Sequence, residues 1–257
     1  MATKSLERLT SSSPRPETSD LRTDKNGNAV RNILLLSLTG EQYQSVVDEL
    51  EFVDLPRGLS LYEPGDTIGY AYFLNGGLCS VIVVTRDGST VEVGIVGREG
   101  LVGAVLAVGM NRSPHRAIIQ MATNGFRVRA EVLRRLVASQ PELLLSIHRY
   151  AQIQGLLIAQ TAACNRLHEI ELRMARWLLI SQDRVGSESL SMTHEFLAQM
   201  LGTGRPSVTL TAGILQRAGL IDCGRGRVRI LDRKGLEAAA CECYENMRQF
   251  HGELGLG

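Results

Sequence analysis

The stretch from Thr193 to Leu220 reads THEFLAQMLGTGRPSVTLTAGILQRAGL, and the spacing of its apolar residues decides the fold of the C-terminal part of the chain. Apolar side chains recur every three or four residues on both sides of Gly202, which predicts two short helices joined by a turn. Gly202 tolerates a positive φ angle, so it can end the first helix and redirect the chain. Three residues of the second helix would point back at the first: Val208, Ala212 and Leu215.

This spacing is that of a helix-turn-helix, in which the small Ala198 lets the second helix cross closely and Gly202 makes the turn. Thr211 departs from the pattern because it occupies a position where an aliphatic residue is usual. The opposite side of the second helix, which carries Arg205 and Thr209, would be exposed. An ordinary helical hairpin has a similar pattern, so the two helices alone leave that alternative open.

Residues 221–231 read IDCGRGRVRIL and predict a tight β-hairpin with two glycines at its tip. Two helices followed by a hairpin form a winged helix. The local charge agrees with this interpretation. Residues 190–234 contain seven Arg or Lys and three Asp or Glu, a balance of +4, whereas the whole chain carries +1. A basic module in an otherwise neutral chain indicates that this module meets phosphate groups.

Length and composition limit the class of protein. A chain of 257 residues suffices for one large or two ordinary domains, and a hydrophobic content of 44% can build a full core. No apolar run reaches the roughly 18 residues of a membrane-spanning helix. Residues 1–20 lack the apolar region of a secretory signal. The five cysteines are odd in number and scattered, which fits a reducing compartment. We therefore expect a cytoplasmic protein with no membrane partner.

The N-terminal part changes character twice. Residues 1–32 are polar and rich in Ser, Thr and charge, which predicts a disordered tail. A short helix capped by Thr39 follows from Ile33. Residues 33–137 then contain short β-type runs separated by Gly, Pro and Asp, which predicts a small antiparallel barrel or jelly roll. The runs are 52–55, 59–62, 72–74, 79–84, 91–96 and 117–121, with short helices expected at 98–108 and 129–137.

From Pro141 the pattern becomes helical, and Gly155 is the only glycine between Glu142 and Val185. A helix of about 25 residues would extend about 37 Å, farther than a small barrel can cover. We therefore expect residues 138–168 to form a dimerisation helix, although packing on its own barrel is the alternative. Its seam would contain Ile147, Ala151, Gln154, Ile158, Thr161 and Asn165. The apolar pattern shifts phase near residues 166–169, which marks a hinge into the winged-helix domain, residues 169–251.

The order of barrel, long helix, hinge and winged helix resembles the CRP/FNR family of bacterial transcription regulators. The resemblance covers about residues 33–232. It rests on Glu63-Pro-Gly-Asp66, Gly76-Gly77, Gly100-Leu-Val-Gly103, the helix start at Pro141, and Thr193–Gly202 followed by Arg205. It implies an α+β fold with an N-terminal antiparallel β-barrel or jelly roll of the cyclic-nucleotide-binding type, a long dimerisation helix and a C-terminal winged helix-turn-helix.

The resemblance also implies a function that is not enzymatic. A homodimer would bind double-stranded DNA at a pseudo-palindromic promoter site, contact RNA polymerase, and act as an activator or a repressor. The barrel, residues 33–137, would be a sensor for an unknown small-molecule effector or a vestige of such a sensor, and the long helix would transmit any signal to the recognition helices.

The sequence departs from the family at the effector pocket. In nucleotide-binding members, a Gly-Glu pair binds the ribose, and an Arg followed by Ser or Thr binds the cyclic phosphate. Here Ala104 follows Gly103, His115 stands at the arginine position and Arg116 at the next. A shift of one residue points a strand side chain to the other face, so the phosphate clamp would be lost. Gly103, His115 and Arg116 are therefore candidate pocket residues for an unknown effector, and cyclic AMP is not expected to bind in the usual mode.

Cofactors and metals are not expected. No cysteine precedes Cys79, so the N-terminal cluster of an iron–sulfur sensor is missing, and only Cys79 and His115 could bind haem in the barrel. Cys241-Glu-Cys243 offers too few ligands for zinc, and we interpret it as a helix face. A metal-dependent cupin enzyme would need several histidines in the barrel, where the chain has one.

The resemblance assigns three base-reading positions near the start of the second helix. They fall on Arg205, Pro206 and Leu210, and only the arginine keeps a family residue that can bridge guanine O6 and N7. Leu210 offers an apolar contact, for example with a thymine methyl group. Ser207 and Thr209 can bond to phosphate or base edges, and Arg225 and Arg227 on the wing would contact phosphates. For the function, the alternative is a small-molecule sensor whose winged helix mediates protein contacts rather than DNA binding. For Arg225 and Arg227, the alternative is a solvated turn without phosphate contacts.

Overall fold

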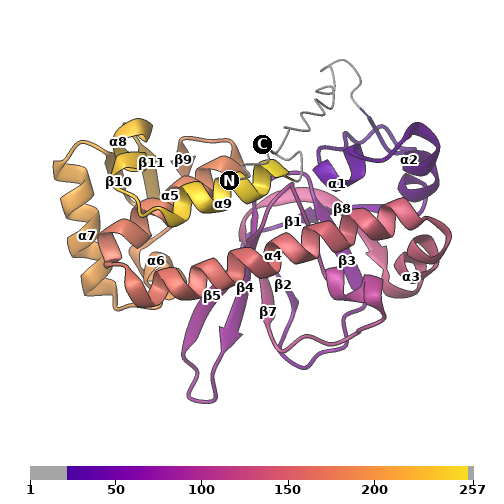
Figure 1. Cartoon of the computed structure of the whole chain (residues 1–257), viewed down its shortest axis with the longest axis horizontal. Helices are drawn as coiled ribbons and strands as arrows, with labels where there is room; N and C mark the ends of the chain where they lie inside the picture. Colours follow the sequence, from indigo (N-terminus) through magenta and orange to yellow (C-terminus); the bar gives the residue numbers. More distant parts are fainter. Residues whose placement is uncertain (1–21, 254–257) are drawn as a thin grey trace, which may run out of the picture.

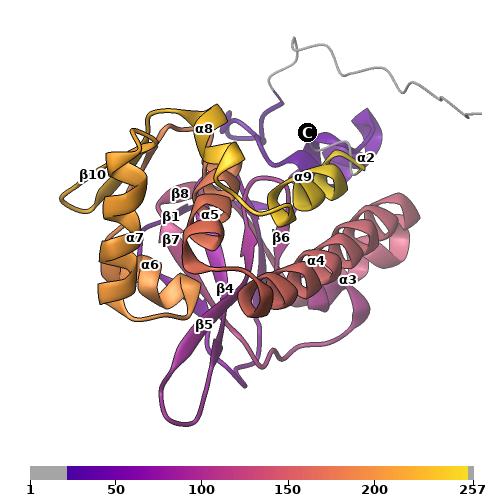
Figure 2. The same cartoon turned by 60° about the vertical axis from the view of Figure 1, so that its left-hand side comes forward.

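The structure is a computed structural model that describes residues 22–253, and it has two parts joined by one long helix (Figure 1). The N-terminal part is a β-barrel with helices at one end, and the C-terminal part is a helical module with a small sheet (Figure 2). In the described part of the chain, no helix combines the length and the apolar character needed to cross a membrane. The predicted α+β fold is confirmed.

The barrel consists of two four-stranded antiparallel sheets. The first has the order β1-β8-β3-β6 and the second β2-β7-β4-β5. Their bounds are Glu51–Leu55 (β1), Thr123–Arg129 (β8), Tyr70–Leu74 (β3), Leu101–Val102 (β6), Ser60–Tyr62 (β2), Arg116–Met121 (β7), Leu78–Val84 (β4) and Thr90–Val96 (β5). The sequence prediction found the four strands of the second sheet and β1 and β3 of the first, but it missed β8, which pairs with both β1 and β3. The predicted helix over 98–108 was wrong in its first half, where strand β6 precedes the 3₁₀ helix at 104–108.

Four short helices close the barrel: α1 (Ile33–Leu36), α2 (Gly40–Val47), the 3₁₀ helix η1 (Ala104–Val108) and α3 (Ala130–Ser139). Thr39 caps α2 as predicted, and its backbone N–H donates to Oε1 of Gln42 at 3.0 Å. Residues 22–32 differ from the predicted disordered tail. Asn32 is fully buried there, and its Nδ2 donates to the carbonyls of Leu74 and Gly100 at 3.1 and 2.9 Å. Residues 1–21 of the predicted tail lie outside the described residues.

The long helix α4 (Pro141–Leu167) has 27 residues, which corresponds to about 40 Å. Its first half packs on the barrel through Leu143, Ile147 and Tyr150. Its second half reaches the C-terminal module, where Leu157 joins the second core. The C-terminal module of the same chain therefore covers one side of the second half of α4, which the barrel does not cover.

The predicted dimer seam of α4 coincides only in part with the exposed face of the helix. Ile147 is buried, and Gln154, Thr161 and Asn165 line a cavity against β5 and the C-terminal module. Ala151 and Ile158 of the predicted seam are exposed. The exposed side of the helix also carries further alanines and large apolar side chains together with polar ones: Leu145, His148, Arg149, Gln152, Leu156, Ala159, Ala162, Ala163, Arg166 and Leu167. The polar residues of the predicted seam thus serve the contact between the two parts of the same chain.

The C-terminal module contains helices α5 to α9 and the sheet β10-β11-β9. The bounds are Ile170–Val185 (α5), Ser189–Leu190 (β9), His194–Leu201 (α6), Arg205–Arg217 (α7), Ile221–Gly224 (β10), Arg227–Ile230 (β11), Arg233–Ala238 (α8) and Cys243–Glu253 (α9). The predicted final helix after Asp232 is two helices, and residues 239–242 separate them. The second core is centred on this module, around Trp177, Leu197 and Leu215, and extends into the barrel through Leu78 and Ile95.

Gly125 in β8 tests the packing of the first sheet. A Cβ at this position would lie 2.3 Å from the carbonyl oxygen of Phe73 on β3, and backbone atoms cannot move away as a side chain can. We predict that Gly125→Ala lowers the free energy of unfolding by on the order of 3 kcal/mol. The matched control is Gly69→Ala, where a Cβ meets nothing within 4 Å. Denaturant unfolding of both variants measures the difference, and equal stabilities would contradict the β3–β8 pairing.

Candidate nucleic-acid interface

Helices α6 and α7 form the predicted helix-turn-helix. The hydroxyl oxygen of Thr193 accepts a hydrogen bond from the Phe196 backbone N–H at 3.1 Å and caps α6. Gly202 ends α6 with φ of 59°, in the left-handed region that glycine favours. The three residues predicted to face α6, namely Val208, Ala212 and Leu215, are buried, and Thr211 is buried with them.

The other face of α7 is open to solvent, and α7 lies on the outer side of the molecule in both views (Figures 1 and 2). Arg205, Ser207, Thr209 and Leu210 are all exposed there, and Leu210 is 64% exposed. The hydroxyl of Thr209 already donates to the carbonyl of Arg205 at 3.1 Å and lies 3.1 Å from Nδ1 of His194. This contact partly satisfies Thr209 and places a histidine that the sequence prediction overlooked beside the reading face.

Strands β10 and β11 form the predicted hairpin, with Gly226 at its tip at φ of 65°. Residues of β11 alternate between exposed and buried, so Val228 and Ile230 reach the core while the arginines between them reach solvent. Arg225 and Arg227 are exposed as predicted. Arg229 is exposed as well, and period-two alternation along RVRI could have identified it.

Two family models match separate parts of the chain. A model of the cyclic nucleotide-binding domain matches residues 52–140, and a model of the Crp-like helix-turn-helix domain matches residues 172–239. The transcriptional regulator SdrP of Thermus thermophilus is 30% identical to the chain in an alignment of 198 residues that covers 70% of this chain and 92% of SdrP. The chain belongs to the CRP/FNR family of transcriptional regulators.

Solved structures of other family members share the fold. A CRP-family transcriptional regulator from Thermus thermophilus has a TM-score of 0.62 and 24% identity, over 73% of this chain and 96% of that one. A Crp/Fnr-family regulator from Eubacterium rectale has a TM-score of 0.62 and 19% identity, over 80% and 96%. The chain is thus a DNA-binding transcription regulator and not an enzyme, as the resemblance predicted.

The three candidate effector residues, Gly103, His115 and Arg116, each make a different local contact. Gly103 begins η1 with φ of 84°. The backbone N–H of His115 donates to the hydroxyl of Ser113 at 3.1 Å. Nε of Arg116 forms an ion pair with Oε2 of Glu63 at 2.7 Å, and both side chains are partly exposed. Glu63, in the turn Glu63-Pro-Gly-Asp66, therefore binds Arg116, the residue after the position at which the family has its phosphate-binding arginine.

The helix-turn-helix contacts the hairpin between β4 and β5, a contact that sequence reasoning missed. Nε2 of Gln199 on α6 donates to the hydroxyl of Thr90 at 2.7 Å. A Cβ at Gly202 would lie 3.1 Å from Cγ2 of Val91, so the turn of the motif rests on the barrel. These contacts hold the turn that leads into α7 beside the β4–β5 hairpin of the barrel.

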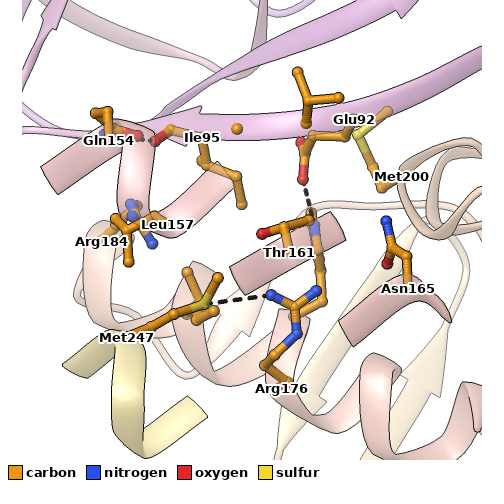
Figure 3. Close-up of a pocket in the computed structure, with 14 residues that line it drawn as sticks. Glu92, Ile95, Gln154, Leu157, Thr161, Asn165, Arg176, Arg184, Met200 and Met247 are labelled. Atoms are coloured by element: carbon orange, nitrogen blue, oxygen red, sulfur yellow. Dashed lines mark hydrogen bonds between the residues drawn. The ribbon is translucent and has the colours of Figure 1, made fainter. Parts of the chain in front are cut away.

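Glu92 lies at the centre of this contact between the two parts (Figure 3). Its Oε1 accepts from Nε1 of Trp177 on α5 at 2.7 Å, and its Oε2 accepts from the hydroxyl of Ser80. The carboxyl group borders a cavity of about 40 Å³ that Arg176 and Arg184 also line. Burial raises the pKa of Glu92 to about 7, although both hydrogen bonds and both arginines act to lower it.

The four sulfur and nitrogen groups near the end of α4 form a second unexpected cluster. Cys164 and His168 lie beside Cys241 and Cys243, and one ligand atom from each lies within 4.8 Å of the others. The interpretation of Cys241-Glu-Cys243 as a helix face assumed that this pair was isolated. That assumption is wrong, because α4 and α9 pack together.

The raised pKa of Glu92 predicts a pH-dependent stability. The pKa of Glu92 is 4.5 in the unfolded chain and about 7 in the folded one, so between these pH values the unfolded chain binds fewer protons than the folded chain. The free energy of unfolding should therefore fall as pH rises through this window. Glu92→Gln keeps an acceptor for Trp177 without ionising, so its stability relative to the native chain should grow with pH, by on the order of 3 kcal/mol.

Denaturant unfolding from about pH 4.5 to about pH 8 measures this effect, because that range spans both pKa values. Glu41→Gln, at an exposed carboxyl on α2, is the matched control and should leave the pH profile unchanged. Parallel profiles for Glu92→Gln and the native chain would show that Glu92 ionises normally.

Proposed function

We propose that the chain is a cytosolic, homodimeric regulator that binds a pseudo-palindromic promoter site through α7 and the β10–β11 wing. The observation that carries the proposal is the exposed face of α7, which presents Arg205, Ser207 and Leu210 with no covering element in the described chain. The wing adds three exposed arginines: Arg225, Arg227 and Arg229. The whole chain carries a net charge of only +1, so its positive charge is concentrated in this module, which is where DNA phosphates would bind. By family resemblance, promoter-bound dimers would contact RNA polymerase.

Residues of the module divide into two roles. Arg205 stands at the first turn of α7, where its guanidinium can bond to both guanine acceptors in the major groove. Ser207 and Thr209 can bond to phosphate or base edges, and Leu210 can contact a thymine methyl group. Arg225 and Arg227 would bind phosphates, which position the module but do not select a sequence.

The homodimer would form along the exposed face of α4. Leu156 is 49% and Leu167 73% exposed although both are large and apolar. Ala159 and Ala163 lie between them at helical spacing, which permits close approach of a second helix. A parallel pair of these helices would hold two α7 helices on one side of DNA, where half-sites are about 34 Å apart. In the full assignment, residues 33–137 form the sensor, 138–168 the dimer helix and 169–251 the DNA-binding domain.

The barrel would respond to an effector other than cyclic AMP bound in the usual mode. Ala104 follows Gly103 and supplies no carboxylate for a ribose. Glu63 already engages Arg116. Tyr150 from α4 packs so closely on Gly100 that a Cβ there would lie 2.3 Å from its ring. These three features support a changed pocket at the barrel end of α4.

Selection of genome fragments by the purified protein tests the DNA-binding proposal. We expect enrichment of a two-fold symmetric site, and we expect Arg205→Ala to lose about 1–3 kcal/mol at one base pair of each half-site. Arg134→Ala, an exposed arginine on α3, is the control. Enrichment that requires cyclic AMP would contradict the assignment of the pocket, and the absence of any symmetric site with native protein would contradict the function.

The salt dependence of DNA affinity tests the wing. If Arg225 and Arg227 each neutralise one phosphate, replacing either with alanine should reduce the slope of log K against log salt by about 1. The loss should be equal for specific and random DNA. Fluorescence anisotropy over a series of salt concentrations measures both. A slope unchanged in both variants would instead favour a wing that makes protein contacts, the alternative function.

A charge at the centre of the α4 face tests the dimer. Leu156→Glu should place two unpaired carboxylates in the interface and raise the dimer dissociation constant at least about tenfold, which corresponds to about 1.4 kcal/mol. Arg134→Glu adds a negative charge to α3 and should not change it. Analytical ultracentrifugation measures both variants. A native chain that sediments as a monomer would contradict the homodimer.

A further inference from the structure

The end of α4 and the start of α9 bring four metal-ligating side chains to one point. Cys164 lies one turn before the end of α4, and His168 is its C-terminal cap. Cys241 lies in the segment between α8 and α9, and Cys243 is the first residue of α9. Sγ of Cys164 lies 3.5 Å from Sγ of Cys241, and Sγ of Cys243 lies 3.6 Å from Nδ1 of His168.

These separations fit a single tetrahedral ion. Zinc binds thiolate at about 2.3 Å and imidazole at about 2.0 Å, so tetrahedral geometry separates two sulfurs by about 3.8 Å and a sulfur from a nitrogen by about 3.6 Å. All four ligand atoms lie within 4.8 Å of one another. An iron–sulfur cluster distributes its ligands over two or more irons and needs a wider set. We propose that Cys164, His168, Cys241 and Cys243 bind one Zn²⁺ ion.

The surrounding side chains orient the ligands as a metal site requires. Nδ1 of His168 faces the cysteines, while its Nε2 lies 3.3 Å from Oε1 of Glu242. A carboxylate that accepts from the far ring nitrogen fixes the tautomer in which the near nitrogen is free to bind metal. Nε2 of Gln160 on α4 donates to Sγ of Cys243 at 3.0 Å. Both contacts are of the kind that hold ligands around zinc.

The charge of the neighbourhood also fits the bound ion. Three thiolates and one Zn²⁺ carry a net charge of −1. Arg173 and Arg176 of α5 lie in electrostatic range of Cys164. Their Nε atoms are buried, and neither has a hydrogen-bond partner in the described part of the chain. A zinc–thiolate centre would offset part of this buried positive charge.

The position of the site gives it a consequence that goes beyond DNA binding itself. The hinge between α4 and α5 is residues 168 and 169. Cys164 lies at the end of the dimer helix and His168 lies in the hinge itself, whereas Cys241 and Cys243 belong to the segment that leads into α9, which packs on α4 and on α5 of the DNA-binding module. The ion would fasten the end of the long helix to that module and fix the angle between them.

Metal binding by the reduced, full-length protein tests the proposal. After chelator treatment, one equivalent of Co²⁺ per chain should give the sulfur-to-cobalt charge-transfer bands and the intense visible absorption of a tetrahedral thiolate site, and one equivalent of Zn²⁺ should remove them. Protein purified without chelator should contain one zinc per chain by mass spectrometry. Hydrogen exchange at residues 164–170 should slow when metal is added. A native chain without the tetrahedral cobalt spectrum would overturn the proposal.

Variants locate the site and separate it from the fold. Cys243→Ser should lose the four-ligand spectrum, whereas Cys223→Ser, at the half-buried cysteine of the wing, should bind one equivalent as the native chain does. Glu242→Gln changes an exposed side chain outside the ligand set, so it should fold normally and bind zinc about 10–100-fold more weakly. Equal zinc affinities of Glu242→Gln and the native chain, or loss of the cobalt spectrum in Cys223→Ser, would contradict the assigned site.

Discussion

The buried contact between the barrel and the DNA-binding module centres on the hydrogen bond from Trp177 to Glu92, and a shared apolar core that includes Leu78 and Ile95 of the barrel surrounds it. A carboxyl group that is 4% exposed is costly to bury, and the structure offsets the cost with two donors and two nearby arginines. Trp177 also packs edge-on against Phe196 of α6, with ring centroids 5.7 Å apart. The barrel strand, the first helix of the module and the helix-turn-helix are therefore linked through one aromatic side chain.

Helix α4 extends this link along the molecule. Its buried face contacts the barrel at one end and the module at the other, while large apolar side chains from Leu145 to Leu167 are exposed on its other side. Two sets of contacts connect the barrel with the helix-turn-helix, one directly through β5 and one through α4 and the hinge. The cluster of cysteines and histidine belongs to the second set. The Glu92 contact and the contact between Gln199 and Thr90 belong to the first.

Local patterns in the sequence predicted the parts of the fold that local patterns determine. The helix-turn-helix, the wing, the cap at Thr39 and most barrel strands depend on spacing within a few residues. Strand β8 was missed because TNGFRVR contains a glycine whose purpose, close approach to the backbone of Phe73, depends on a distant strand. The polar positions of the predicted α4 seam were misplaced because Gln154, Thr161 and Asn165 line a cavity formed by residues far along the chain, whereas Ala151 and Ile158 are exposed.

The residues of the proposed sites divide in the same way. Arg205 and the wing arginines could be found from the sequence because charge and exposure follow from helical and strand periodicity. The partners of Cys241 and Cys243 could not, since Cys164 lies 77 positions from Cys241 and only the packing of α4 on α9 brings them together. Glu92 gave no indication of its role for a similar reason, since its partner Trp177 is 85 positions away.

Hydrogen exchange of the indole N–H of Trp177 tests the central contact most directly. Trp177 is the only tryptophan of the chain, so its indole gives a single assigned signal in a ¹H–¹⁵N spectrum. If the barrel and the module are held together as described, this proton is buried and bonded to Glu92, and it should exchange far more slowly than a free indole. Exchange at the rate of a free indole would show that the two parts separate in solution and would contradict the account.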